Sequence, residues 1–225
     1  MAYEYITKNL SEVRSEITDA SHGRDVTLIA VTKSGTDEEL IALAKAGARE
    51  MGENRPQELV RRSALLKDAG LSVKMHQIGN LQRNKARAVV GTASLIHTLD
   101  NLALAEEINK RAALLGIKMP VLIEVNSASE PQKDGVLPEL AEQFAKDLLR
   151  LENLSLSGLM TMGPVCEGEE IRPYFRLTRE LFERIGDRFG YEGNGILSMG
   201  MSDSYRIAIE EGSTLVRVGR RLFEK

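Results

Sequence analysis

The feature that most constrains this chain is a repeated alternation of short apolar segments with amphipathic helical ones. Residues 26–31 (VTLIAV) form an almost unbroken apolar run rich in β-branched side chains, which is typical of a parallel strand buried on both faces. Thr36 and Glu39 follow at the spacing of a capping box, which predicts a helix that lasts until Gly47. The alternation continues to the C-terminus, so it predicts parallel strands joined by crossover helices.

This alternation predicts eight strands. They cover residues 26–31, 48–52, 73–78, 94–99, 120–125, 154–160, 195–198 and 214–218. Helices are predicted after the first seven strands, over residues 36–47, 56–69, 81–90, 102–115, 138–149, 174–189 and 202–211. A further helix precedes the first strand, because Ile6, Leu10, Val13 and Ile17 share one face at helical spacing. No helix is predicted after the last strand, and we expect the N-terminal helix to take that place.

Eight such units predict a single-domain (β/α)8 TIM barrel over residues 1–225, with no linker inside it. A doubly wound open sheet is the main alternative. That fold usually has fewer strands, and no GxGxxG follows the first predicted strand to support a dinucleotide site. The barrel directs the search for function to the C-terminal ends of the strands, where the active sites of this fold lie.

Composition excludes several classes of function. The chain has 30 Lys and Arg against 33 Asp and Glu, with no block of like charge, so it lacks the footprint of a nucleic-acid or anionic-membrane binder. A single cysteine, Cys166, allows neither an internal disulfide nor a structural zinc site. No apolar leader starts the sequence and no apolar run is long enough to span a bilayer. We therefore expect a cytoplasmic protein without a metal.

The first three predicted strands end in polar residues. Lys33 leaves the first strand, where desolvation would favour a neutral amine that can form a Schiff base with an aldehyde or ketone. The alternative is a lysine that reaches solvent through a loop. Asn54, after the second strand, offers an amide to a ligand or caps the next helix. His76, in the third strand, either contacts a ligand or is a hydrogen-bonded core histidine.

The seventh and eighth predicted strands end in a pattern suited to an anion. Residues 198–203 (SMGMSD) form a small-residue loop before a predicted helix, where free N–H groups and the helix dipole favour a phosphate. Gly219 ends the eighth strand and allows close approach of the backbone. Ser202 as a simple helix cap is the other interpretation. Together with Lys33, this pattern indicates a phosphorylated carbonyl compound, either a sugar phosphate of a Schiff-base aldolase or pyridoxal 5′-phosphate (PLP).

These residues belong to a longer series of motifs. In order along the chain, the sequence resembles the YggS/PROSC family of PLP homeostasis proteins from its first helix to its last strand. The segments that carry the resemblance are residues 30–33 (AVTK), 51–58 (MGENRPQE), 76–85 (HQIGNLQRNK), 96–100 (IHTLD), 158–162 (GLMTM), 197–203 (LSMGMSD) and 211–219 (EGSTLVRVG). The resemblance implies a barrel similar to the N-terminal domain of alanine racemase.

The resemblance also implies a role for each matching residue. Lys33 would hold PLP as a Schiff base, and Arg217 would donate to the pyridine nitrogen. The remaining residues would hold the phosphate or line the cofactor. The phosphate group comprises Ser198, Met199, Gly219 and Arg220, and the lining group comprises Asn54, His76, Ile78 and Met160.

The implied function is intracellular PLP homeostasis with little or no turnover and no catalytic residue. PLP-requiring apo-enzymes are possible recipients, and we expect a monomer. An arginine stays protonated, so Arg217 would oppose a positive charge on the ring nitrogen and make PLP a poor electron sink. An amino-acid racemase remains the alternative, but the second acid/base group that it needs is not evident, Tyr205 being the one tyrosine near the proposed site.

The sequence departs from the family at three positions. Gln77 stands where an aromatic residue is more frequent, and Asn80 stands where a histidine is more frequent. Arg220 occupies a position where many members have threonine, so one hydroxyl donor to the phosphate is lost. A Schiff-base aldolase and a barrel without a ligand remain further alternatives.

Overall fold

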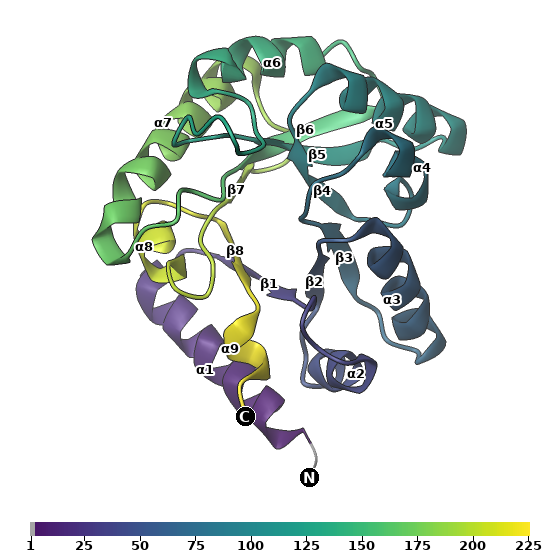
Figure 1. Cartoon of the computed structure of the whole chain (residues 1–225), viewed down its shortest axis with the longest axis vertical. Coiled ribbons are helices and arrows are strands. Elements are labelled where there is room, and N and C mark those ends of the chain that lie inside the picture. Colours follow the sequence, from purple (N-terminus) through teal and green to yellow (C-terminus); the bar gives the residue numbers. More distant parts are fainter. Residues whose placement is uncertain (1–2) are drawn as a thin grey trace.

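The structure is a computed structural model that describes residues 3–225, and it contains a closed barrel of parallel strands in sequence order (Figure 1). Strand β1 pairs with both β2 and β8, which closes the barrel. The strands are β1 (Thr27–Val31), β2 (Glu50–Glu53), β3 (Lys74–Gln77), β4 (Leu95–Leu99), β5 (Met119–Glu124), β6 (Leu154–Met160), β7 (Ile196–Ser198) and β8 (Leu215–Val218). The predicted (β/α)8 barrel is confirmed.

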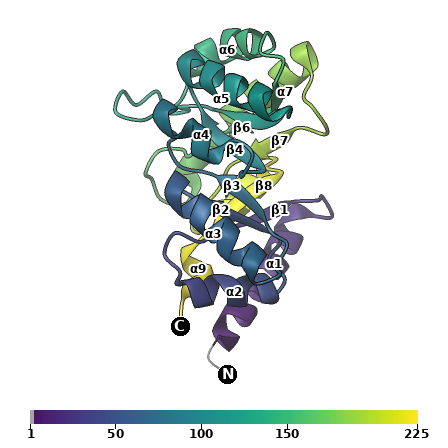
Figure 2. The ribbon, with the colours of Figure 1, turned by 90° about the vertical axis from the view of Figure 1, so that its right-hand side faces the viewer.

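Helices surround the barrel in both views (Figures 1 and 2). The α-helices are α1 (Glu4–Ser21), α2 (Asp37–Lys45), α3 (Pro56–Asp68), α4 (Ala86–Val89), α5 (Leu102–Leu115), α6 (Ala141–Leu148), α7 (Arg172–Phe189), α8 (Tyr205–Glu210) and α9 (Arg220–Phe223). Short 3₁₀ turns, η1 (Arg83–Lys85), η2 (Pro138–Leu140) and η3 (Gly168–Ile171), precede α4, α6 and α7. Within the described chain, no helix has the length and apolar character needed to cross a membrane.

Two predictions about the helices are wrong in detail. The chain after β8 forms the short helix α9, where no helix was predicted. Helix α8 begins at Tyr205 rather than at Ser202, because Ser202 uses its hydroxyl to accept a hydrogen bond from the backbone N–H of Gly219. The capping box of α2 is confirmed, since Thr36 and Glu39 bond each other's backbone N–H groups.

Helix α1 completes the outer ring, as predicted. It packs against α8 and α9 on one side and against α2 on the other (Figure 1). The face that holds Ile6, Leu10, Val13 and Ile17 is buried in the main apolar core. That core fills the space between the barrel wall and the helices, so α1 occupies the position left by the short α9.

Alternation along each strand decides which side chains enter the barrel. In β5, Val121 and Ile123 join the outer core, whereas Leu122 joins a small cluster inside the barrel with Leu95 and Met160. Because successive side chains point to opposite faces, the residue at the C-terminal end of β5 shares the inner face of Leu122. The same alternation sends polar side chains inward from other strands, and these form the site described next.

Candidate functional site

A cavity of about 250 Å³ opens at the C-terminal end of the barrel and contains most of the predicted site residues. Its walls come from the ends of β1, β2, β3 and β8 and from the loops after β6 and β7. Six of the ten predicted residues line it, namely Lys33, Asn54, Ile78, Arg217, Gly219 and Arg220. The strand-one lysine and the end of the last strand therefore share one space.

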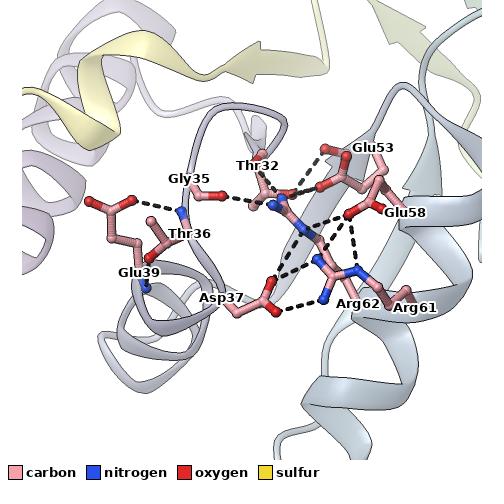
Figure 3. Close-up of polar contacts among 10 residues, drawn as sticks. Thr32, Gly35, Thr36, Asp37, Glu39, Glu53, Glu58, Arg61 and Arg62 are labelled. Atoms are coloured by element: carbon pink, nitrogen blue, oxygen red, sulfur yellow. Dashed lines mark hydrogen bonds and ion pairs between the residues drawn. The ribbon is translucent and has the colours of Figure 1, made fainter.

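The loop that carries Lys33 is held by a buried arginine of α3 (Figure 3). Nη1 of Arg62 donates to the backbone carbonyl of Thr32 at 2.5 Å, and Nη2 donates to that of Gly35 at 2.7 Å. Nη1 also lies 2.6 Å from Oε1 of Glu53, which in turn accepts a hydrogen bond from the hydroxyl of Thr32. The backbone on both sides of Lys33 is thus fixed, while the Lys33 side chain is exposed.

Sequence reasoning missed Arg62. Of the two interpretations given for Lys33, the structure shows the one in which the side chain reaches solvent. Arg62 and Glu53 are nine residues apart, and their side chains are 8% and 2% exposed. A buried charge is tolerated when it is paired and hydrogen-bonded, which both partners are here. Arg62 shares one helix face with Leu59 and Leu66 at helical spacing, and this position on an apolar face is the sequence signal that could have found it.

Asn54 is held at the same rim by Gln77. The side-chain amide of Gln77 donates to the backbone carbonyls of Asn54 at 3.0 Å and of Gly79 at 2.9 Å. A side chain at Gly79 would bring its Cβ within 2.5 Å of the Asn54 carbonyl oxygen, so only glycine permits this approach. The departure from the family at Gln77 therefore supplies a polar clamp between the ends of β2 and β3.

Arg217 is fully enclosed at the base of the cavity. Its side chain points inward from β8, and the residue is 3% exposed. Nη1 donates to Oγ of Ser198 at 2.5 Å, and Nη2 donates to the carbonyl of Thr161 at 2.9 Å. Burial lowers the pKa of Arg217 to about 10, with Glu124 acting in the opposite direction, so the guanidinium is still charged at neutral pH.

Ser198 continues this contact into a polar chain across the barrel interior. Its hydroxyl lies 3.1 Å from Nδ1 of His97, and Nε2 of His97 lies 3.1 Å from Nδ1 of His76. Nε2 of His76 lies 3.1 Å from Oε2 of Glu50, an ion-pair contact whose geometry does not meet that of a hydrogen bond. When both rings are neutral, Oγ of Ser198 can donate to His97 and His97 to His76, so that the donors point from Arg217 towards Glu50.

The surroundings of His97 favour its neutral form. Burial, together with the nearby charges of His76 and Arg217, holds the pKa of His97 well below its usual value. The contact with His76 lowers the pKa of Glu50 to about 2. A neutral His97 between a guanidinium and a carboxylate can accept at Nδ1 and donate at Nε2, which keeps Ser198 available as an acceptor for Arg217.

Four predicted residues do not line the cavity. His76 belongs to the polar chain and lines a different cavity, at the N-terminal end of the barrel. Met160 packs inside the barrel against Leu95 and Leu122, and Ser198 lies below the cavity under Arg217. All three point inward, as alternation requires, but they lie deeper along the barrel axis than the cavity does.

Met199, the fourth, has a backbone N–H that is already bonded within the protein. It is fully buried in the outer core, and its N–H donates to the carbonyl of Leu215 at 3.2 Å. The residues of this loop that reach the cavity are Met201, Ser202 and Asp203. The part of this loop that lines the cavity is therefore residues 201–203, and a role of Ser198 and Met199 in holding a phosphate stays a prediction.

Where the loops after β7 and β8 form the cavity wall, the groups with hydrogen-bond donors belong to Ser202, Gly219 and Arg220. The N–H of Gly219 donates to Oγ of Ser202 at 3.3 Å, which joins the two loops. Arg220 forms an exposed ion pair with Asp203 across the opening. Because α8 starts only at Tyr205 and spans six residues, the anion-binding potential lies in these groups rather than in a helix N-terminus.

Comparison with known proteins identifies the family of the chain. The chain matches the family of the alanine racemase N-terminal domain over residues 3–224. It is 39% identical over 224 residues to the pyridoxal phosphate homeostasis protein of Aquifex aeolicus, covering 99% of this chain and 97% of that protein. It is 34% identical over 225 residues to the protein of the same name from Escherichia coli K12, covering 97% and 95%.

Solved structures give the same result. PipY of Synechococcus elongatus, solved with PLP bound, has a TM-score of 0.86 and 30% identity, over 97% of this chain and 100% of that chain. An alanine racemase of Clostridium difficile has a TM-score of 0.74 at 18% identity, over 99% of this chain and 57% of that chain. The racemase shares the fold, and at this identity the likeness shows nothing more.

Proposed function

Because this chain belongs to the family of pyridoxal phosphate homeostasis proteins, we propose that it binds pyridoxal 5′-phosphate at Lys33 and serves PLP homeostasis with little or no turnover. The single observation that carries this proposal is that Lys33 and Arg217 line one cavity. When bound, PLP supplies an aldehyde with which a lysine amine can condense. The fixed backbone around Lys33 holds the amine at the cavity rim.

The residues present fit each part of the cofactor. Nζ of Lys33 would hold the aldehyde carbon, and the buried guanidinium of Arg217 would offer a donor to the ring nitrogen. The hydroxyl of Ser202 and the guanidinium of Arg220 offer donors to the phosphate, beside Gly219, whose N–H bonds Oγ of Ser202. Asn54 and Ile78 bound the ring on the remaining side. His76, Met160, Ser198 and Met199 would act on the cofactor only through these residues.

Arg220 takes a defined part in this proposal. Its partner Asp203 carries the same sign of charge as a phosphate, and both side chains are exposed, at 71% and 78%. An exposed ion pair contributes little to stability, so Arg220 can exchange Asp203 for a phosphate at small cost. The charge of Arg220 then substitutes for the hydroxyl of the more frequent threonine.

Limited turnover follows from the chemistry around Arg217 and Tyr205. A guanidinium that stays charged opposes protonation of the ring nitrogen. The hydroxyl of Tyr205 does not serve the cavity, because it bonds Glu16 on α1 and Nη1 of Arg221. Tyr205 is therefore unsuited to be the second acid/base group of a racemase. PLP-requiring apo-enzymes are the recipients we propose for the released cofactor, and a monomer is the form we expect.

Titration with PLP tests this proposal. Added PLP should give the absorbance of a lysine-bound cofactor in the wild type, and Lys33→Ala should lose that band while keeping its far-ultraviolet circular dichroism. Lys67→Ala, which changes an exposed lysine of α3, is the matched control and should behave as the wild type does. An unchanged band in Lys33→Ala contradicts the assignment. Amino-acid-dependent deuterium exchange at Cα with racemisation would favour the racemase alternative.

A further inference from the structure

A second cavity, of about 380 Å³, adjoins the cofactor cavity at the C-terminal end of the barrel. The two share Asn54, Ile78 and Met162 as a common wall. The second cavity continues over the ends of β3, β4, β5 and β6. Its lining residues are the more polar, and apart from the shared wall none of them takes part in the proposed binding of PLP.

Apart from the side-chain amide of Asn54, the amide and hydroxyl groups of this second cavity are already bonded within the protein. The hydroxyl of Thr98 donates to a backbone carbonyl at 2.8 Å, and the side-chain amide of Asn126 donates to another at 2.8 Å. The hydroxyls of Ser127 and Thr161 lie 3.0 Å apart and bond each other. These hydrogen bonds fix the shape of the cavity. The ionisable residues of its lining then decide which charge a ligand should carry.

Lys133, a cation in this wall, is also satisfied. Its Nζ lies 2.6 Å from Oε1 of Glu130 and 3.2 Å from the carbonyl of Gly163. A carboxylate ligand would have to displace Glu130 to reach it. The second cavity therefore presents no uncommitted positive charge among the residues described for its lining.

Glu124 is different, because it is buried without a partner. It lies at the end of β5 on the inner face of the barrel, lines the second cavity and is 9% exposed. Within residues 3–225, no hydrogen bond or ion pair reaches its carboxylate. A buried charge normally has a partner that offsets its desolvation, so the native arrangement leaves this one to a ligand or to a proton.

The charged groups around Glu124 shift its pKa in known directions. Burial is the main cause that raises the pKa of Glu124 to about 7, and Asp100 beyond β4 and Asp134 beyond β5 add to it. Arg217 on β8 acts in the opposite direction. Asp134 also lines the second cavity, where it accepts a hydrogen bond from the side-chain amide of Asn80 at 2.8 Å. The local field thus favours a cation.

We propose that the second cavity binds a small primary amine, whose ammonium group bonds the carboxylate of Glu124 beside the cofactor cavity. A metal ion is a poorer occupant, because the described residues contain no group of three or more His, Cys, Asp and Glu side chains able to hold one. An amino acid is also a poorer occupant, because its carboxylate would face Asp134 and find Lys133 already paired. The occupant is therefore an amine without a carboxylate.

Binding of the amine should be linked to the release of a proton from Glu124 and should therefore depend on pH. An ammonium group favours the charged form of Glu124, so at pH 6 to 7 binding should release a proton from Glu124. Affinity should then rise with pH up to about 8, while the amine itself stays protonated. Glu124→Gln keeps the shape of the side chain but removes its charge, and it should abolish both effects.

The test uses the full-length protein freed of PLP, with ethanolamine as the probe and binding followed by NMR titration. Ethanolamine should bind on the order of tenfold more tightly than ethylene glycol, its neutral analogue, or glycine, which adds a carboxylate. Glu124→Gln should weaken ethanolamine binding by about tenfold, and Glu152→Gln, which changes an exposed carboxylate, should leave it unchanged.

Equal affinity for the three probes, or an unaltered affinity in Glu124→Gln, overturns the inference, as does tighter binding of Mg²⁺ or Ca²⁺ at the same residues. The inference goes beyond the proposed function and fails separately from it. A protein that takes up PLP at Lys33 but ignores ethanolamine contradicts only the amine site. One that binds ethanolamine through Glu124 but never PLP contradicts only the cofactor proposal.

Discussion

Nη1 of Arg217 donates a hydrogen bond to Oγ of Ser198 at 2.5 Å, and this contact joins the cofactor cavity to the interior of the barrel. Ser198 is fully buried at the end of β7, and its hydroxyl is also within hydrogen-bond distance of His97. The guanidinium is therefore oriented by a residue that does not line the cavity. Ser198 acts through Arg217, as a positioning residue.

Removal of this acceptor should move the guanidinium. Ser198→Ala is expected to shift the absorption maximum of bound PLP and to lower the free energy of unfolding by about 1.5–3 kcal/mol, since the lost bond involves a charged donor. Ser157→Ala is a control, because Ser157 is also buried but donates only to a carbonyl within β6. A spectrum identical to the wild type would count against the positioning role. Absorption spectra and urea titrations measure both effects.

The contacts of Arg62 with the Lys33 loop should contribute far more to stability than the contacts of its exposed neighbour Arg61. Arg62→Leu leaves the buried Glu53 carboxylate without its counter-charge, so we expect a loss of about 3–5 kcal/mol in unfolding free energy and weaker PLP binding. Arg61→Leu removes exposed pairs with Asp37 and Glu58 and should cost about 1 kcal/mol or less. Similar losses in the two variants, measured by chemical denaturation, would refute the anchoring role of Arg62.

The pH dependence of stability should contain two opposing contributions. The folded-state pKa of His97 lies below its usual 6.5, so its contribution to stability is present above pH 6.5 and is lost as the pH falls. The folded-state pKa of Glu124 is raised from 4.5 to about 7, so its contribution is present below pH 4.5 and is lost as the pH rises to about 7. The two oppose each other between pH 4.5 and 6.5.

In Glu124→Gln, the contribution of His97 to the pH dependence of stability should no longer be offset. Between pH 6.5 and 5, the unfolding free energy of this variant should fall with decreasing pH more steeply than that of the wild type, by up to about 1.4 kcal/mol per pH unit. His97→Gln should show the reverse change, with stability that rises on acidification. Urea titrations at several pH values measure these slopes. Parallel slopes in the wild type and Glu124→Gln would contradict the raised pKa.

The exposed pair of Asp203 and Arg220 should compete with a phosphate. Asp203→Asn frees Arg220 and removes a like charge, so inorganic phosphate and PLP should bind about two- to fivefold more tightly at low salt. The gain should shrink as ionic strength rises. Asp187→Asn, at an exposed carboxylate of α7, is the control. Weaker phosphate binding by Asp203→Asn in calorimetry would show that Asp203 helps to form the site.

Sequence alone predicted the architecture well, because the strand and helix periods differ and the barrel repeats them. It placed the apolar face of α1, the capping box of α2 and the cavity shared by Lys33 and Arg217. The sequence did not predict how deep an inward-pointing residue lies along the barrel axis. His76, Met160 and Ser198 all point inward, as alternation requires, but alternation does not tell how far below the rim an inward residue lies.

The missed contacts have a different cause. Arg62 and Glu53 meet because α3 folds back over the end of β2, and Glu124 is isolated because its neighbours bond one another. Both depend on which partners are already taken, a property of the packed structure rather than of any local pattern. The commitment of the Met199 N–H to the pairing of β7 with β8 is a property of the same kind.

The most direct measurement of the central claim is peptide mass spectrometry of the PLP-treated protein after borohydride reduction. The account predicts a phosphopyridoxyl group on the peptide that contains Lys33, and its absence from that peptide in Lys33→Ala. Modification confined to other lysines, or no modified peptide at all, would contradict it.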